Sequence, residues 1–492
     1  MHTVFTIFAN NFLGKTPPWY KLTILVFLII NPIVFYLISP FVAGWMLLIE
    51  FIFTLALALK CYPVPSGGLL AIEALLIGLT SADSLYKEIV VNLPTLLLLI
   101  FMVGGIYYIK DVIFLIFTKI FISIRKKYAL SFMFCLLSAC LSAFLDALTL
   151  MAVIIAVCFN FYAIYHRVEG SLAEGRGEKA LEAVHELEEF RGFLRNIIMH
   201  GAVGTALGGT MTLVGEPQNL MIGTTMGWSF LDFFVHCSVV SLPVAVVGLI
   251  LCPLLEIFNF PGFGYQLSEK ARQAIVKDYE KKARQSTAQS KYIYITQIIV
   301  AVLLVLALGF HVAEIGLIGI ALIIVLTAFT GITKEHDFAG AFSNAMPFVT
   351  LIVIFFAILA VVHDQHLVTP LASWVFNFEG RAQLLALYFT NGTLSFISDN
   401  VFIASVFITE VNKAYQAGLF SAEWFEKLAV VVNMGTNIPA VATPNGQAAF
   451  LFLLTSSLAP VIELSYMRMV KLALPYTIVM TATGAVAVYF WL

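Results

Sequence analysis

Two aspartates interrupt long apolar runs of this sequence, and each lies four residues after a serine. Asp146 follows Ser142 in the stretch Leu-Ser-Ala-Phe-Leu-Asp, and Asp399 follows Ser395 in Leu-Ser-Phe-Ile-Ser-Asp. A carboxyl group in hydrocarbon is costly, so acids at matching places in two apolar runs indicate a functional site. Such a carboxylate binds a cation or a proton, because each stabilises the charge that burial disfavours.

Each aspartate is followed by a glycine- and threonine-rich stretch that ends in proline and asparagine. These stretches span residues 209–219 and 435–447. Proline removes a backbone donor and frees carbonyl groups, so each stretch predicts a helix that unwinds at membrane depth. We expect sodium at the two aspartates, and the predicted cation- and proton-binding residues of the two halves are Ser142, Asp146, Thr149, Thr210, Thr212 and Asn219, with Ser395, Ser398, Asp399, Asn400, Thr436, Asn437, Thr443 and Asn445.

The charge of these elements predicts the sign of the substrate. Neither element contains Lys or Arg, and hard cations prefer oxygen ligands, so a cation fits better than an anion. Suppose that the binding site switches between the two sides of the membrane only when it holds a cation or a proton. Competition between cation and proton at one carboxylate then produces antiport. The alternative is that Asp146 and Asp399 merely cap half-helices, whose N-termini stabilise a carboxylate.

Three glutamates are secondary candidates for the same role. Glu216 precedes Pro217 in the first glycine-rich stretch, where it could equally be a loop acid. Glu50 and Glu73 lie inside predicted spans. For these two, the alternative to proton movement is a position at a helix interface or near a membrane boundary.

The composition is that of a membrane protein with many helices. Of 492 residues, 61% are hydrophobic and 11% are charged, with a mean hydropathy of +0.96. The six cysteines lie singly in apolar segments and are predicted to be small buried hydrophobes. No nucleotide-binding loop or nucleophile–base pair occurs, which argues against an enzyme. We expect no cleaved signal peptide, so the spans themselves must direct membrane insertion.

Apolar runs of about 20 residues predict the membrane spans. We expect them at 22–39, 41–59, 66–80, 92–109, 233–256, 293–310, 314–332, 346–362 and 470–491. Two re-entrant hairpins are predicted at 128–165, around Asp146, and at 382–414, around Asp399. Broken helices are predicted at 196–227 and 428–457.

The distribution of charge predicts the orientation. The first hairpin follows Arg125-Lys126-Lys127 and precedes His166-Arg167, so its ends are expected in the cytoplasm, although two full crossings satisfy this equally well. The second hairpin lacks this positive excess, which indicates the opposite orientation and an inverted repeat. The predicted divisions are an interfacial segment 1–21, a first repeat 22–266 with a cytoplasmic loop 166–195, a cytoplasmic linker 267–292 and a second repeat 293–492.

Two further segments contain histidine, and both are expected to connect helices rather than to sense pH or bind a metal ion. His185 lies in the charged loop, where a pH-sensing role has no further support. The sequence His-Asp-Gln-His at 363–366 resembles a metal cluster without further ligands and is interpreted as an outer loop.

The sequence closely resembles the NhaB family of bacterial sodium/proton antiporters, part of a wider ion transporter superfamily. The likeness extends over nearly the whole chain and is clearest at residues 11–14, 19–22, 31–32, 41–45, 141–149 and 440–449. It implies an all-α protein of two inverted repeats, each with a re-entrant hairpin and a broken helix. It also implies a homodimer with elevator-like transport.

The expected activity follows from this resemblance. It is electrogenic exchange of internal sodium or lithium for external protons across the bacterial inner membrane, with membrane lipid around the protein and with no cofactor or nucleic acid. Related dicarboxylate carriers bear Ser-Asn-Thr at their hairpin tips, where this chain has Asp146 and Asp399. Two alternatives stay open, namely a sodium-coupled anion (dicarboxylate) symporter and a cation channel.

Overall fold

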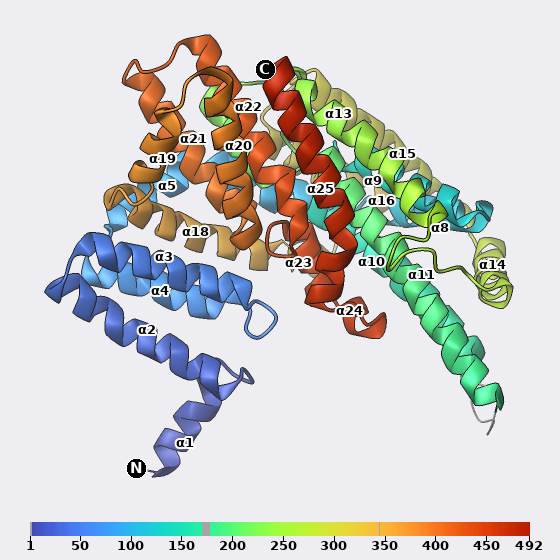
Figure 1. Ribbon diagram of the computed structural model, residues 1–492. Helices are drawn as coiled ribbons and strands as arrows, with labels where there is room; N and C mark the ends of the chain where they lie inside the picture. Colours follow the sequence, from blue (N-terminus) through green and yellow to red (C-terminus); the bar gives the residue numbers. More distant parts are fainter. Residues whose placement is uncertain (1, 170–177, 344) are drawn as a thin grey trace.

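The computed structural model describes residues 2–169, 178–343 and 345–492, and its regular structure is helical (Figure 1). No strand occurs among these residues, which confirms the all-α prediction. In chain order the elements are α1 (His2–Asn11), α2 (Pro18–Leu37), α3 (Pro40–Ala56), α4 (Pro63–Ile77), α5 (Ala82–Val91), α6 (Leu93–Leu97), the π-helix η1 (Leu98–Met102), α7 (Val103–Tyr107), α8 (Lys110–Ser123), α9 (Lys127–Ser142), α10 (Ala147–Glu169), α11 (Glu178–Gly209), α12 (Pro217–Met226), α13 (Phe230–Ile257), α14 (Glu269–Arg284), α15 (Ala288–Gly309), α16 (Ile315–Thr330), α17 (Glu335–Ser343), α18 (Met346–Asp364), α19 (Thr369–Phe376), α20 (Gly380–Ile397), α21 (Asn400–Gln416), α22 (Ala422–Asn437), the 3-10 helix η2 (Pro439–Ala442), α23 (Ala448–Thr455), α24 (Leu458–Val461) and α25 (Tyr466–Trp491).

Six of the described helices are long and apolar enough to cross a membrane, namely α2, α10, α13, α15, α18 and α25. A seventh span results if α5 and residues 93–107 are taken together, although the pair bends by 64°. The bend lies at the N-terminal edge of the predicted span 92–109, where Pro94 lies in the first turn of α6, and the π-helical turn η1 then separates α6 from α7. The apolar helices α3, α4, α9 and α16 are shorter, at 10–17 residues.

Proline determines where the first three long helices begin. Pro18, Pro40 and Pro63 each occupy the first helical position of α2, α3 and α4, where the missing N–H costs nothing. The three helices pack together at one end of the molecule, as Figure 1 shows. The hydroxyl of Tyr20 donates to Ser66 Oγ over 2.9 Å and joins α2 to α4.

Both predicted helix pairs around the aspartates are present. Residues 143–146 separate α9 from α10, and Ser398 and Asp399 separate α20 from α21. Both predicted interruptions are present as well. Residues 210–216 separate α11 from α12, and the segment from 438 to 447, which contains η2, separates α22 from α23.

Glycine allows each interrupted helix to touch an arm of the neighbouring helix pair. A Cβ atom at Gly204 or Gly208 of α11 would collide with the backbone of Cys135 or Ala139 in α9. In the other half, a Cβ at Gly435 of α22 would lie 2.8 Å from the carbonyl oxygen of Tyr388 in α20. Small residues at both contacts permit the backbones to approach closely.

Three segments are more helical than the predicted divisions indicate. The charge pattern of 166–195 is typical of an amphipathic helix or loop, and the segment is largely helical where it is described. In it, α10 continues to Glu169 and α11 runs unbroken from Glu178 to Gly209; residues 170–177 lie outside the described part. The predicted linker 267–292 contains α14, which Ser268 caps at its N-terminus. The sequence reading also missed α8, which follows directly on the bent span.

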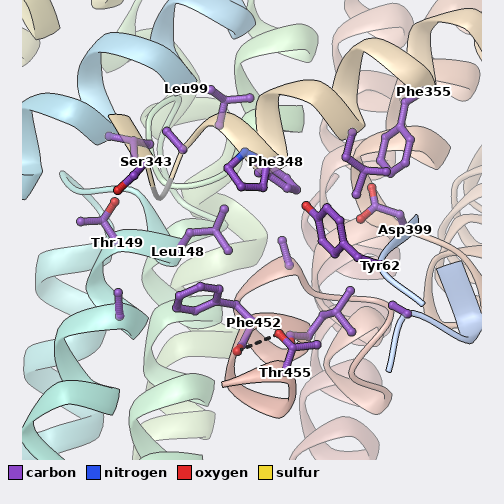
Figure 2. Close-up of a pocket in the computed structure, with 18 of the residues that line it drawn as sticks. Tyr62, Leu99, Leu148, Thr149, Ser343, Phe348, Phe355, Asp399, Phe452 and Thr455 are labelled. Carbon is purple, nitrogen blue, oxygen red and sulfur yellow. Dashed lines mark hydrogen bonds between the residues drawn. The ribbon is translucent and has the colours of Figure 1, made fainter. Parts of the chain in front are cut away.

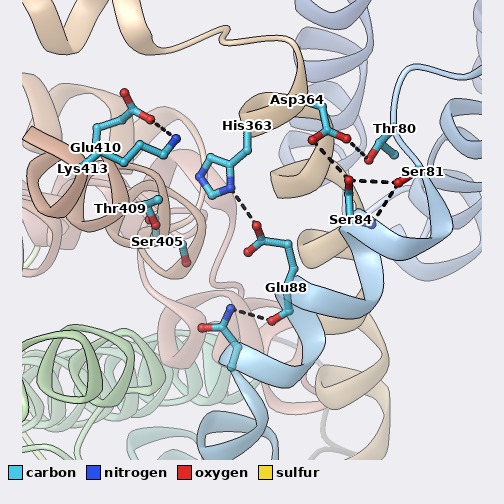
Figure 3. Close-up of polar contacts among 11 residues, drawn as sticks. Thr80, Ser81, Ser84, Glu88, His363, Asp364, Ser405, Thr409, Glu410 and Lys413 are labelled. Atoms are coloured by element: carbon cyan, nitrogen blue, oxygen red, sulfur yellow. Dashed lines mark hydrogen bonds and ion pairs between the residues drawn. The ribbon is translucent and has the colours of Figure 1, made fainter. Parts of the chain in front are cut away.

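The His-Asp-Gln-His segment is only partly a loop. His363 and Asp364 end α18, and their side chains bond to α5 and the residues before it (Figure 3). His363 Nδ1 lies 2.8 Å from Glu88 Oε1, and Asp364 accepts from Thr80 over 2.8 Å. These contacts join α18 to α5 and use one ring nitrogen of His363 and the carboxyl group of Asp364.

Candidate cation and proton site

The two aspartates cap the second arms of their helix pairs. Asp146 Oδ2 accepts from the backbone N–H of Thr149 over 3.0 Å and from its hydroxyl over 3.3 Å. Asp399 Oδ1 accepts from the N–H groups of Val401 and Phe402 over 2.9 and 3.2 Å. Each carboxyl group thus uses one oxygen for capping, as the alternative interpretation expected. Both residues are buried, and Asp146 Oδ1 has no hydrogen-bonding partner among the described residues.

In each half, a threonine hydroxyl of the interrupted helix donates to the tip of the nearby helix pair, where the tip is the turn between the two arms and the residues beside it. Thr212 Oγ1 donates to the carbonyl of Ala143 over 2.6 Å, and Thr443 Oγ1 donates to the carbonyl of Phe396 over 2.6 Å. The first contact is supplemented by the N–H of Ala147, which donates to Gly215 O over 3.3 Å. The same chemical link therefore occurs in both halves of the chain.

Side-chain amides bridge both interruptions. Asn219 Nδ2 donates to the carbonyl of Gly209, the last residue of α11, over 2.6 Å. Gln447 Nε2 donates to the carbonyl of Asn437, the last residue of α22, over 2.9 Å. Each amide spans ten residues of sequence. These bonds satisfy carbonyls that the end of a helix leaves without intrahelical donors.

The two interruptions also contact each other. Asn437 Nδ2 donates to Asn219 Oδ1 over 3.2 Å, and Gln218 Nε2 donates to Asn437 Oδ1 over 2.7 Å. Asn433, one turn before Asn437, donates to the carbonyl of Thr210 over 3.2 Å. A continuous network of amides thus joins α12 to α22, and the bonded residues Gln218 and Asn437 are 219 positions apart in the chain.

Glu216 lies with the aspartates, unlike the other secondary candidates. It immediately precedes α12, is 2% exposed, and is close enough to Asp146 and Asp399 for its charge to interact with both. Its Oε1 has no hydrogen-bonding partner among the described residues. Three carboxyl groups therefore share one buried region, where mutual repulsion favours bound cations or protons.

Other predicted oxygens of this region are buried and unpartnered. Within the described part of the chain, no hydrogen bond reaches the hydroxyl oxygens of Ser142, Ser395 and Ser398 or the side-chain amide of Asn400. Buried polar groups normally have partners, so several exceptions at one place indicate a ligand site. No three His, Cys, Asp or Glu side chains of the described residues are close enough to hold a metal ion together, so a cation would need hydroxyl, amide or carbonyl oxygens as well.

A cavity of about 290 Å³ reaches this region (Figure 2). Its wall includes three predicted site residues, Thr149, Asp399 and Asn445. The rest of the wall is mainly apolar and comes from α3, the segment after it, η1, α7, α10, α17, α18 and α23; Figure 2 shows Tyr62 and Asp399 among these residues. Asp399 therefore lies at the wall of this cavity.

The remaining predicted residues have other contacts. The hydroxyl groups of Thr210 and Thr436 donate to Ala206 and Val432 of their own helices, over 2.7 Å each. Glu50 and Glu73 meet each other on α3 and α4, where Asn31 Nδ2 donates to both carboxyl groups over 2.7 and 2.9 Å. For these two glutamates, the position at a helix interface is therefore what the structure shows.

The sequence reading missed Gln218, Asn433 and Gln447 as members of the network. A signal existed for Asn433, because it lies four residues before Asn437 and interrupts the apolar run Val430-Val431-Val432. Residues four apart share one face of a helix, so the two amides had to lie side by side.

An all-helical protein that buries three carboxyl groups beside two interrupted apolar helices is, by fold and site, a multi-pass membrane protein of the secondary ion transporter class. The family follows from comparison with known proteins. Residues 1–492 match the family model described as "Bacterial Na+/H+ antiporter B (NhaB)", and the chain belongs to this family.

Curated relatives agree with this assignment. The chain is 54% identical over 484 residues to the Na(+)/H(+) antiporter NhaB of Saccharophagus degradans, with 97% of both chains covered. It is 51% identical over 492 residues to the protein of the same name from Pseudomonas entomophila, with 98% of both covered. The corresponding protein of Yersinia enterocolitica is 54% identical over 489 residues, covering 98% of this chain and 93% of the relative. The matches confirm the resemblance identified from the sequence, and the family is one of transporters.

Proposed function

We propose that this chain is a sodium/proton antiporter of the bacterial inner membrane, and that it exchanges the two ions at Asp146, Asp399 and Glu216. The observation that supports this site most directly is the burial of these three carboxyl groups beside two interrupted helices. Carbonyl, hydroxyl and amide oxygens of the interruptions complete the coordination of a sodium or lithium ion.

Competition between ion and proton provides the exchange mechanism. A buried carboxylate without a positive partner is unstable, so each carboxyl group holds either a cation or a proton. In the described residues, no Lys or Arg side chain forms an ion pair with any of the three acids. Three carboxyl groups allow unequal numbers of sodium ions and protons to move in opposite directions, which is the condition for electrogenic exchange.

The proposed architecture is an inverted repeat, with α9–α10 and α20–α21 as re-entrant hairpins and α11–α12 and α22–α23 as broken helices. The matched threonine and amide bonds of the two halves support this pairing. Residues 22–266 and 293–492 then form the two repeats, joined by the cytoplasmic segment 267–292. We extend the proposal to elevator-like movement in a homodimer, which the family resemblance suggests.

Proteoliposomes with an imposed pH gradient test the activity. Sodium, lithium, potassium and succinate are added in turn, and proton movement is followed with a pH-sensitive dye. We expect sodium or lithium, but not potassium or succinate, to dissipate the gradient, and a membrane potential to develop when no counter-ion can move. Sodium-dependent uptake of succinate would identify an anion symporter, and currents far above carrier turnover would identify a channel.

A further inference from the structure

A second cavity, of about 370 Å³, lies between α8, α10, α14 and α15, and none of the three carboxyl groups lines it. These helices gather at one edge of the molecule, on the right of Figure 1. One face of α8 contributes Asp111 and Lys119, α14 contributes Asp278, Tyr279 and Lys282, and Lys291 comes from the start of α15.

The charges of the cavity favour an anion with one negative charge. Three lysines line it against two aspartates, and Lys282 is paired with Asp278 over 2.9 Å. Lys119 and Lys291 form no ion pair within the described part of the chain, although both are exposed. The excess of one positive charge matches the single charge of a phosphodiester. Asn160, Ser286 and Tyr279 add hydrogen-bond donors for its oxygens.

The position of the cavity corresponds to a membrane interface. Lys291 lies near the N-terminus of α15, an apolar helix long enough to span the membrane, and Tyr294 lies beside it. Tyrosines of this kind mark the headgroup level. The adjoining segments 125–127 and 269–284 have more Lys and Arg than Asp and Glu, so this interface is on the cytoplasmic side.

An apolar track leads from the cavity along α15. Ile295, Ile298 and Val302 follow Lys291 at helical spacing, and their side chains are 58%, 49% and 55% exposed. Headgroup contacts at one end and exposed apolar side chains along the same face match the shape of a phospholipid. A free phosphate ester would use only the polar end.

We propose that this cavity binds the headgroup of an anionic phospholipid of the cytoplasmic leaflet, with its acyl chains along α15. Basic pockets between membrane helices on the cytoplasmic side recognise such headgroups. Because Asp146 caps the other end of α10, a bound lipid contacts a helix of the ion site. The binding itself does not depend on which ion is transported.

Native mass spectrometry of the full-length protein with dioleoylphosphatidylglycerol, and with dioleoylphosphatidylcholine for comparison, tests this proposal. We expect phosphatidylglycerol to bind more tightly than phosphatidylcholine. In the double variant Lys119→Gln/Lys291→Gln, the affinity for phosphatidylglycerol should fall by about 25-fold, since each lysine contributes roughly fivefold. The matched control is Lys277→Gln/Lys281→Gln, which removes two charges from α14 outside the cavity. Replacement of Lys119 and Lys291 by arginine keeps both positive charges, so it should preserve lipid binding. That result would show that the fold tolerates substitution at these two positions.

Three results would overturn the proposal. Equal losses in the two double variants would mean general attraction to a basic surface, and an undiminished affinity in Lys119→Gln/Lys291→Gln would place the lipid elsewhere. Competition by glycerol 3-phosphate at the same affinity as the lipid would identify a site for a soluble phosphate ester.

Discussion

Asn437 donates a hydrogen bond of 3.2 Å from its side-chain amide to the side-chain oxygen of Asn219, and this bond joins the two interrupted helices. Both residues are fully buried, and each also participates in an amide bond across an interruption. The two interruptions of the proposed ion site therefore share one polar framework, and we expect a change in one half to affect the other.

The aspartates are expected to be essential for exchange but not for folding. Asp146→Asn and Asp399→Asn each retain a side-chain oxygen for capping but lose the charge that binds sodium. We expect exchange to fall at least 100-fold in each variant, as measured in proteoliposomes, with little change in thermal stability. Asp83→Asn, at an exposed position in the first turn of α5, is the matched control. If both variants bind sodium as tightly as the unmodified protein does, the sodium site must lie elsewhere.

The side chains of Asn219 and Asn437 should be energetically coupled, because a hydrogen bond joins them. Asn219→Ala leaves the carbonyls of Gly209 and Thr212 without their donor, so we expect a loss of about 2–3 kcal/mol of stability. A double-mutant cycle with Asn437→Ala, followed by thermal unfolding, should give a coupling energy above about 0.5 kcal/mol. Additive effects would show that the two interruptions are independent. Asn11→Ala removes a single exposed amide bond and serves as the control.

The threonine tethers should determine how firmly the helix-pair tips are held. Thr212→Val and Thr443→Val each remove a hydrogen bond of 2.6 Å to a tip carbonyl, at a cost of about 1 kcal/mol. We expect faster amide hydrogen exchange at residues 143–149 in Thr212→Val and at 396–402 in Thr443→Val. Thr225→Val, which loses only a bond within α12, should leave both segments unchanged. Unaltered exchange rates in the two tether variants would exclude this role.

The sequence predicted the elements of the site better than their contacts. Apolar runs interrupted by Asp146 and Asp399 determine both helix pairs, because a charged group cannot lie in the middle of a lipid-exposed helix. Pro217 was expected inside an unwound stretch, whereas it occupies the first helical position of α12, where its missing N–H costs nothing. The partners of Glu216 were not predictable, since its approach to both aspartates depends on packing between segments far apart in the chain.

Short and bent elements were the least predictable part of the fold. The helix α8 has the apolar residues of a span but only 14 residues, and polar Asp111 and Lys119 lie on its cavity-facing side. Its position at the proposed interface comes from contacts with α10 and α14, which no local pattern encodes. The roles of Glu50 and Glu73 were ambiguous for a related reason, because the sequence does not show that Asn31 lies between them.

Asn31 should stabilise the N-terminal helices rather than take part in exchange. Asn31→Leu leaves two buried carboxyl groups without their shared donor, so we expect a loss of about 3 kcal/mol, measured by thermal unfolding in detergent. Adding Glu50→Gln and Glu73→Gln should restore much of this stability, because neutral amides are less costly to bury than carboxylates. The exposed substitution Asn10→Leu controls for the added apolar side chain. Loss of sodium-dependent proton movement in a stably folded Glu50→Gln/Glu73→Gln variant would instead make this pair part of the transport pathway.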